Sequence, residues 1–228
     1  MSESTGPGAH HFDVKSSRVV YDGAILALRL DQVEMPGGRV AEREVVEHFG
    51  AVAVVARDED GRIAMVRQYR HPVGRRLLEI PAGLLDKGGV EQPLAAAQRE
   101  LAEETDLRAQ RWQVLVDLDL SPGFTDEALR VYLAEELSQH HVAEREDEEA
   151  DMSLEWVALD DAVSMVLSGD IDEATARPLM QKYFGAIPRG PVNTPAQADV
   201  PTLSAPIVKT MHDRVANTRL TRSWAVPG

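Results

Sequence analysis

Residues 91–105 constrain the fold of this chain more than any other segment, because they combine a helical apolar stripe with a dense carboxylate face. The stripe consists of Leu94, Ala97 and Leu101, whose spacing predicts a helix packed on a core. Beside it lie Glu100, Glu103 and Glu104, at positions i, i+3 and i+4. Neighbouring like charges on a helix cost roughly 0.2–0.5 kcal/mol per pair. Carboxylate oxygens are natural ligands of Mg²⁺ and Mn²⁺, so we expect a metal site at the rim of a cleft; the simpler alternative is a solvated acidic face.

The three glutamates belong to a longer pattern, which begins with Pro81-Ala82-Gly83 and continues through Glu91 to the segment 99–107. This pattern resembles the Nudix box of the Nudix hydrolases, G-x5-E-x7-R-E-U-x-E-E-x-G-U, where U is a bulky apolar residue. Two positions depart from it: the loop between Gly83 and Glu91 is longer by two residues, and Asp106 replaces the last glycine. Two glycines in the loop can take up the extra length, and Asp accepts the left-handed backbone that commonly follows a helix. Neither departure removes an expected ligand.

The composition narrows the classes of partner. The 228 residues carry a net charge of −14, and the sequence pI is about 4.9. So acidic a chain is unsuited to nucleic-acid backbones and anionic membranes, and we expect neither as a partner. The lack of cysteine excludes disulfides and thiolate metal sites, which fits a cytoplasmic protein. Residues 1–8 lack the basic and apolar regions of a signal peptide, and the apolar run 51–56 is too short to span a bilayer.

We expect three regions along the chain: an N-terminal arm with antiparallel strands over 1–47, a Nudix domain over 48–185, and a proline-rich extension over 186–228. Mixed strands around one long helix predict the α/β class, and the Nudix resemblance implies an α/β/α sandwich with a mixed sheet. Gly37-Gly38 and the stretch 58–61 are predicted hairpin turns. The predicted strands are 17–22, 25–34, 39–47, 51–57, 63–69, 77–80, 112–119, 128–136 and 153–158, and the predicted helices are 91–105, 160–168 and 173–184.

Further segments carry a second, narrower resemblance. They are Gln68-Tyr69-Arg70, the segment 75–86, the acidic block 148–152, and Pro122, which lies fifteen residues after Leu107. They look like the ADP-ribose pyrophosphatases, in the ADP-sugar branch of the family. The resemblance implies hydrolysis of ADP-ribose to AMP and ribose 5-phosphate with Mg²⁺ or Mn²⁺. Two alternatives stay open: a pyrophosphatase for another nucleoside diphosphate sugar, and a non-catalytic sensor that binds ADP-ribose. The intact acidic residues of the box argue against the sensor.

The family resemblance also implies roles for individual residues of the box. The expected metal ligands are the backbone carbonyl of Ala82 and the side chains of Glu100, Glu103 and Glu104, with Glu103 also counted as a catalytic carboxylate. Arg99 would pair with Glu91, some two helical turns away, and hold the loop after Gly83 against the helix. Such a pair supports the ligands without taking part in the reaction.

Hydrolysis also needs a base that takes a proton from the attacking water. The related pyrophosphatases use a glutamate from a mobile loop, and the acidic stretch 140–151 is the corresponding loop here. Glu148 is the preferred candidate, its neighbour Glu149 comes next, and Glu144 and Glu146 are weaker. The simpler interpretation is a solvated run of charge. A base on a loop implies that the loop closes over the substrate before hydrolysis.

Candidate substrate contacts lie before and after the box. Guanidinium groups suit phosphate oxygens, and four arginines are concentrated just before it: Arg67, Arg70, Arg75 and Arg76. Glu79 could accept hydrogen bonds from ribose hydroxyls or adenine, Pro122 marks the ADP-sugar branch, and Phe124 could stack on a base. The related pyrophosphatases exchange N-terminal strands between subunits, so we expect a homodimer whose first strands help to build the substrate site.

Overall fold

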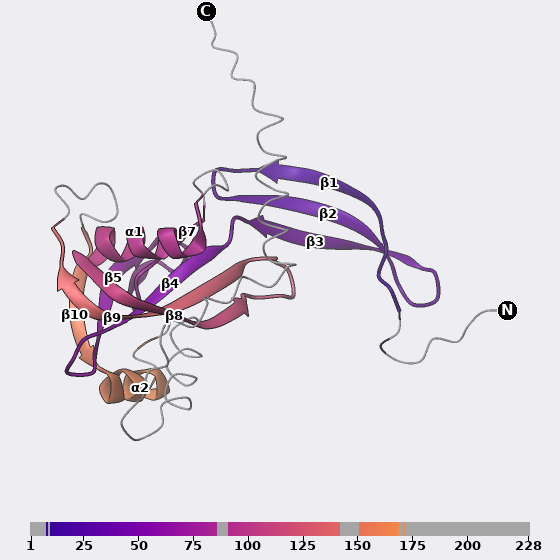
Figure 1. Cartoon of the computed structure of the whole chain (residues 1–228). Helices are drawn as coiled ribbons and strands as arrows, with labels where there is room; N and C mark the ends of the chain where they lie inside the picture. Colours follow the sequence, from indigo (N-terminus) through magenta and orange to yellow (C-terminus); the bar gives the residue numbers. More distant parts are fainter. Residues whose placement is uncertain (1–7, 9, 86–90, 142–150, 169–170, 172–228) are drawn as a thin grey trace, which may run out of the picture. The chain divides into compact units, whose positions relative to one another are not determined.

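The computed structural model describes residues 8, 10–85, 91–141, 151–168 and 171 (Figure 1). The chain divides into two compact units, one made of residues 1–50 and 119–128, the other of residues 51–118 and 129–228. The predicted helix 173–184 and the extension 186–228 lie outside the described residues. Within the described residues, no helix is long and apolar enough to cross a membrane.

The first unit is an antiparallel sheet of three strands, β1 (Val14–Asp22), β2 (Leu26–Glu34) and β3 (Val40–His48), in the order β1-β2-β3. The predicted hairpin turn between β2 and β3 is confirmed. Gly37 and Gly38 have φ angles of 89° and 81°, which glycine adopts without strain. Every residue of β1 is exposed. The antiparallel N-terminal region is therefore present as predicted, with one strand largely in solvent.

A later segment of the chain completes this unit. The backbone N–H of Val46 donates to the carbonyl of Phe124 at 2.7 Å, and that of Asp126 donates to the carbonyl of Val46 at 3.2 Å. The Asp126 carboxylate in turn accepts a hydrogen bond from the N–H of His48 at 3.0 Å. The end of β3 is thus held by a loop that lies 78 residues further along the chain.

Asp31 in β2 is a buried carboxylate within this small sheet. It accepts hydrogen bonds from the Ser17 hydroxyl at 2.6 Å and from the Arg29 guanidinium at 2.9 Å. Burial alone would raise the pKa of Asp31, but these two donors outweigh burial and lower the pKa. The ionised carboxylate therefore stabilises the sheet above about pH 4, and this contribution is lost as the pH falls through the lowered pKa.

We predict that Asp31→Asn lowers the free energy of unfolding at neutral pH, because the amide cannot replace a carboxylate that receives two donors. The difference from wild type should shrink as the pH is lowered from about 4 to about 2, where the wild-type carboxyl also becomes neutral. Urea unfolding at several pH values measures this. Asp22→Asn, at the exposed end of β1, is the matched control and should change little. An Asp31→Asn deficit that is the same at every pH would contradict the prediction.

The second unit is a mixed sheet with helices on its two faces (Figure 1). Its strands are β4 (Ala51–Arg57), β5 (Arg62–Arg70), β6 (Arg75–Glu79), β7 (Ala82–Leu84), β8 (Leu107–Asp119), β9 (Ala128–Gln139) and β10 (Ser153–Ala158), and its helices are α1 (Pro93–Thr105) and α2 (Leu159–Ser168), with a short 3₁₀ turn at His71–Val73. The order is β10-β5-β4-β9-β8, with β6 paired to β5 and β7 paired to β4. β4 and β9 are parallel, whereas β4 pairs antiparallel with β5 and β7. The predicted α/β/α sandwich with a mixed sheet is confirmed.

The core of this unit explains the position of α1. Val52 and Val54 of β4 belong to a buried cluster with Ala97 and Leu101 of α1, and all four are fully buried. Leu94 packs against the same cluster, so the predicted apolar stripe faces the sheet. The opposite edge of the helix is left for polar side chains.

Several predicted boundaries are wrong: β1 begins at Val14 instead of residue 17, and β9 ends at Gln139 instead of residue 136. The sequence predicts no strand over 82–84, but Ala82–Leu84 forms β7, because Ala82 and Gly83 find ladder partners in Ala53 and Val52 of β4. β8 begins at Leu107 instead of residue 112. The reason lies in the residue before it, since Asp106 adopts φ 56° and ψ 32° and turns the chain from the helix directly into the strand.

Candidate functional site

Both ends of helix α1 are formed by residues that suit the termini of a helix. It begins with Pro93, whose missing N–H is not needed in the first turn. It ends at Asp106, which has the expected left-handed conformation and donates its N–H to the Ala102 carbonyl at 3.0 Å. Between these ends, Glu100 and Glu104 are only 8% and 4% exposed. Two nearly buried carboxylates on one helix require donors or cations close by.

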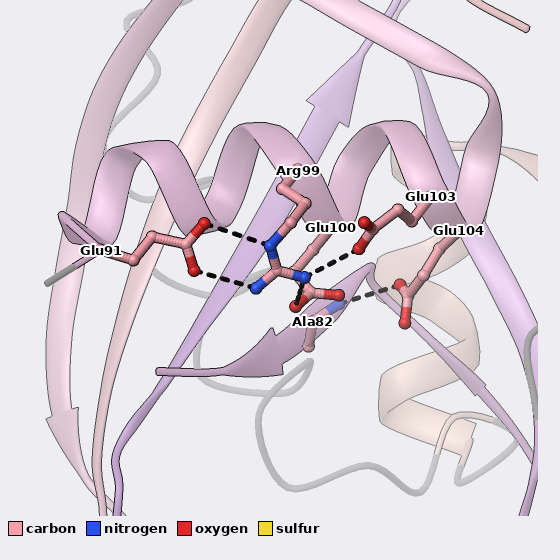
Figure 2. A network of polar contacts seen from close by, with 6 residues as sticks. All are labelled: Ala82, Glu91, Arg99, Glu100, Glu103 and Glu104. Atoms are coloured by element: carbon pink, nitrogen blue, oxygen red, sulfur yellow. Dashed lines mark hydrogen bonds and ion pairs between the residues drawn. The ribbon is translucent and has the colours of Figure 1, made fainter. Parts of the chain in front are cut away.

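Arg99 is the centre of a polar network on this helix (Figure 2). Its Nε and Nη2 donate to the two oxygens of Glu91, each at 3.1 Å, so the expected Arg99–Glu91 pair is present. Its Nη1 donates to Glu100 at 2.6 Å and to Glu103 at 2.8 Å. Burial alone would lower the pKa of Arg99, but the hydrogen bonds to Glu91, Glu103 and Glu100 raise it above its ordinary value. One guanidinium therefore holds three carboxylates in place.

Strand β7 brings its backbone against the same carboxylates (Figure 2). The N–H of Ala82 donates to Glu104 at 3.1 Å. A Cβ on Gly83 would lie 2.0 Å from the carboxyl carbon of Glu100, so this position accepts only glycine unless the glutamate moves. The structure thus brings Ala82 and Gly83 to the face of α1 that carries Glu100 and Glu104.

This arrangement fits a hard divalent cation by the chemistry of its donors. It offers carboxylate oxygens from Glu100, Glu103 and Glu104, two of them on nearly buried side chains. Within the described ranges, however, no three acidic or imidazole side chains already surround a single point. Glu100 and Glu103 accept hydrogen bonds from Arg99, and Glu104 accepts one from the Ala82 N–H. Binding of a cation would require these oxygens to exchange part of their present partners.

We predict that Gly83→Ala leaves the protein folded but lowers turnover about tenfold to a hundredfold. The new methyl group would displace the Glu100 carboxylate. Small misplacements at a reacting centre have effects of this size. Steady-state kinetics and circular dichroism measure the two quantities. Gly61→Ala is the contrasting variant: its φ is 79° and a Cβ there meets open space, so it should lose stability but keep turnover. Normal turnover in Gly83→Ala would refute the assigned contact.

Three of the arginines expected at the substrate, Arg67, Arg70 and Arg76, are paired with carboxylates. Arg67 donates to both oxygens of Glu155, at 2.6 and 3.3 Å. Arg76 donates to the Asp151 carboxylate at 2.5 Å. These pairs join β5 and β6 to β10 and its preceding residues. Arg75, at the start of β6, is exposed.

Glu79, the last residue of β6, is bound by two side chains of β5. It is 4% exposed and accepts hydrogen bonds from Gln68 at 2.6 Å and from Arg70 at 2.9 and 3.2 Å. These hydrogen bonds from Gln68 and Arg70 on β5 to Glu79 on β6 therefore hold the two strands together. Phe124 is 58% exposed and Pro122 is exposed, both in the first unit. The candidate bases Glu144, Glu146, Glu148 and Glu149 lie outside the described residues.

Sequence reasoning missed an ion pair of a buried arginine in the second unit. Arg130 on β9, whose side chain is 4% exposed, donates to both carboxylate oxygens of Asp117 on β8, at 2.7 and 2.8 Å. Burial raises the pKa of the neighbouring Tyr132 phenol. The available signal was an arginine at an inward position of an otherwise apolar strand. Such a pair aligns β8 with β9, since removal of one partner would leave a buried charge.

Comparison with known proteins agrees with the motif and the geometry. A family model described as the NUDIX domain matches residues 47–181. A second, described as the nucleoside diphosphate sugar hydrolase N-terminal domain, matches residues 12–46. The chain therefore belongs to the Nudix family of hydrolases.

Individual members of that family are similar to this chain over most of its length. The ADP-ribose pyrophosphatase of Mycobacterium tuberculosis (strain ATCC 25618 / H37Rv) is 56% identical over 167 residues, which cover 73% of this chain and 80% of that protein. The ADP-ribose pyrophosphatase of Bacillus subtilis (strain 168) is 41% identical over 68% of this chain and 83% of its own. A crystal structure of an ADP compounds hydrolase has a TM-score of 0.67, covering 77% of this chain and 94% of that one. At 19% identity, this last likeness supports the fold alone.

Proposed function

We propose that this protein hydrolyses the pyrophosphate bond of ADP-ribose to give AMP and ribose 5-phosphate, with Mg²⁺ or Mn²⁺ as cofactor. The observation that carries the proposal is the set of box glutamates held by Arg99 on α1 against the backbone of β7. Two relatives at 56% and 41% identity bear the name ADP-ribose pyrophosphatase. We also propose a cytoplasmic location, because a chain without cysteine suits a reducing compartment.

The chemistry assigns distinct tasks to the residues of the box. Glu100, Glu103, Glu104 and the Ala82 carbonyl would hold the cations, which neutralise the phosphates and lower the pKa of a bound water. Arg99 keeps Glu100 and Glu103 on one side of the helix, and Glu91 anchors Arg99 from the other end. Glu148, or its neighbour Glu149, would accept the proton of the attacking water.

The remaining residues would bind the substrate. Arg67, Arg70 and Arg76 are 40–45% exposed side chains that are paired with carboxylates, so each can turn part of its guanidinium fork to a phosphate or ribose oxygen. Phe124 offers an exposed ring for stacking on a base. Glu79 would act through Arg70, whose guanidinium it holds.

A hydrolysis screen tests the proposed substrate. ADP-ribose, GDP-mannose and other nucleoside diphosphate sugars are incubated with Mg²⁺ and with Mn²⁺, and AMP or the corresponding monophosphate is separated by chromatography. ADP-ribose should give the highest kcat/KM. Preference for another sugar would move the proposal to the alternative pyrophosphatase, and absence of hydrolysis with tight ADP-ribose binding would move it to a sensor.

We further propose that the protein is a homodimer whose N-terminal strands help to complete the substrate site. Large apolar side chains of the first unit are exposed, including Val14, Val19, Tyr21, Ile25 and Val40. Burial of such side chains against a second copy would remove this apolar surface from water.

Light scattering at micromolar concentration should therefore give the mass of two chains. Deletion of residues 1–47 should produce a monomer with greatly weakened affinity for ADP-ribose, although the carboxylates of the box stay in the chain. A full-length monomer at this concentration would contradict the dimer. A truncated protein with a normal KM would contradict the role of these strands in the substrate site.

A further inference from the structure

A hollow lies beside α1. Its volume is about 540 Å³, within the range of small-molecule sites. Gln98 and Ala102 of α1, Arg108 and Trp112 of β8, and His140 line most of it. Neither Glu100 nor Glu104 lines it, and Ala82 does not either. Arg99 and Glu103 border both the hollow and the carboxylate cluster, whereas Gln98, Arg108, Trp112 and His140 line the hollow outside that cluster.

Three polar side chains of this hollow have no partner within the described part of the chain. Gln98, Arg108 and His140 make no side-chain hydrogen bond or ion pair there. His140 is held only through its backbone, whose N–H donates to the Asp106 carbonyl at 2.7 Å. Among the arginines of the second unit this is unusual, since Arg67, Arg99 and Arg130 are all paired. Among the described residues, Arg108 and His140 therefore line one hollow without a bound carboxylate.

One carboxylate lies in the wall of the hollow. Glu103 lines it, and its carboxylate accepts the hydrogen bond of Arg99 at 2.8 Å, while Arg99 lines the same wall. The guanidinium of Arg99 therefore offsets part of the negative charge that an anion at Arg108 would meet.

Trp112 gives the hollow a rigid aromatic surface. Its indole N–H donates to the Ala109 carbonyl at 3.0 Å, and its ring packs edge-on against Tyr132 at 6.1 Å between centroids. The indole is thus held in one orientation from both sides. Ala102 and Ala109 add small apolar side chains next to it, which leaves room for a flat ring.

We propose that this hollow binds a small anion that carries a planar aromatic ring, with the chemistry of a nucleoside monophosphate. The phosphate would lie at Arg108 and His140, and the base would lie along Trp112 with Gln98 as a hydrogen-bond partner. A guanidinium and an imidazole suit a phosphate dianion, and an indole face with a side-chain amide suits a base.

The test is a titration of ¹⁵N-tryptophan-labelled full-length protein with AMP in EDTA, followed by NMR of the indole N–H groups. Trp112→Phe identifies the Trp112 resonance. We expect AMP to move this resonance saturably and to leave that of Trp156 in place. Adenosine should not move it, and inorganic phosphate should bind more weakly than AMP. The proposal would be overturned if the Trp112 resonance did not move at millimolar AMP, or if adenosine moved it with the same affinity as AMP. Equal affinity for inorganic phosphate and AMP would refute a site for the ring.

Variants separate this site from the reaction site. Arg108→Glu should weaken AMP binding about tenfold or more. Arg39→Glu is the matched control, since Arg39 is also exposed and without a side-chain partner among the described residues, but lies in the β2–β3 turn. It should bind AMP as wild type does. Glu104→Gln should keep AMP binding as well. Either loss of AMP binding in Glu104→Gln or normal AMP binding in Arg108→Glu would refute the site. No hydrolysis is measured, so failure here is independent of the proposed reaction.

Discussion

Glu104→Gln should lower turnover about a thousandfold while the protein stays folded. The amide keeps the size of the side chain and can still accept the hydrogen bond of the Ala82 N–H, which is 3.1 Å away in the wild type. It cannot supply the negative charge that a divalent cation requires, and loss of several kcal/mol of transition-state stabilisation gives a drop of about this size. Kinetics with ADP-ribose across a Mg²⁺ series measure the effect.

The matched control for this variant is Glu59→Gln in the exposed β4–β5 turn, which removes the same charge from the same unit. It should retain turnover, which shows that net charge alone is not responsible. If Glu104→Gln kept a third of wild-type activity at limiting Mg²⁺, Glu104 would not be a metal ligand. A thermal unfolding curve close to that of the wild type is needed to attribute the loss to chemistry.

Glu148→Gln should lower turnover by about 10²–10⁴ while leaving KM and the Mg²⁺ requirement nearly unchanged, because a general base acts on the proton of the water and not on binding. This pattern separates it from Glu104→Gln, which should raise the Mg²⁺ requirement as well. Single-turnover kinetics at saturating metal and substrate measure the chemical step directly.

Glu149→Gln is the control, since it removes the adjacent carboxylate of the same acidic stretch. If Glu149→Gln is inactive and Glu148→Gln nearly normal, the base is Glu149. If both variants turn over at wild-type rate, the stretch 140–151 is a solvated run of charge and the base lies elsewhere.

The sequence predicted α1 well because helix periodicity is a local property. The spacing of Leu94, Ala97 and Leu101 indicated the face toward the sheet, and all three pack there. The same spacing placed the glutamates beside that face, where Glu100 and Glu104 are nearly buried. β7 escaped prediction for the opposite reason. Its Ala-Gly-Leu sequence has no strand pattern of its own, and its conformation depends on the ladder with β4.

The partners of the charged side chains were harder to predict. Arg99–Glu91 followed from the motif, but the bonds from Arg99 to Glu100 and Glu103 depend on the direction that the guanidinium takes over the helix. Arg67 finds Glu155 88 residues away, because β10 pairs with β5. Pairings of this kind follow from strand order, which no local pattern of residues contains.

The division of the first unit between two stretches of chain has a consequence for synthesis on the ribosome. Residues 10–48 are made early and can form the β1–β2–β3 hairpins at once, since those contacts are local. The bonds from Val46 and His48 to Phe124 and Asp126 must wait until 78 further residues have been translated. At about 5–20 residues per second, this interval lasts about 4–16 seconds. During that time the sheet has only its own hairpins to keep it folded, and the exposed apolar side chains of β1, Val14, Val19, Val20 and Tyr21, are open to neighbouring nascent chains on the same message.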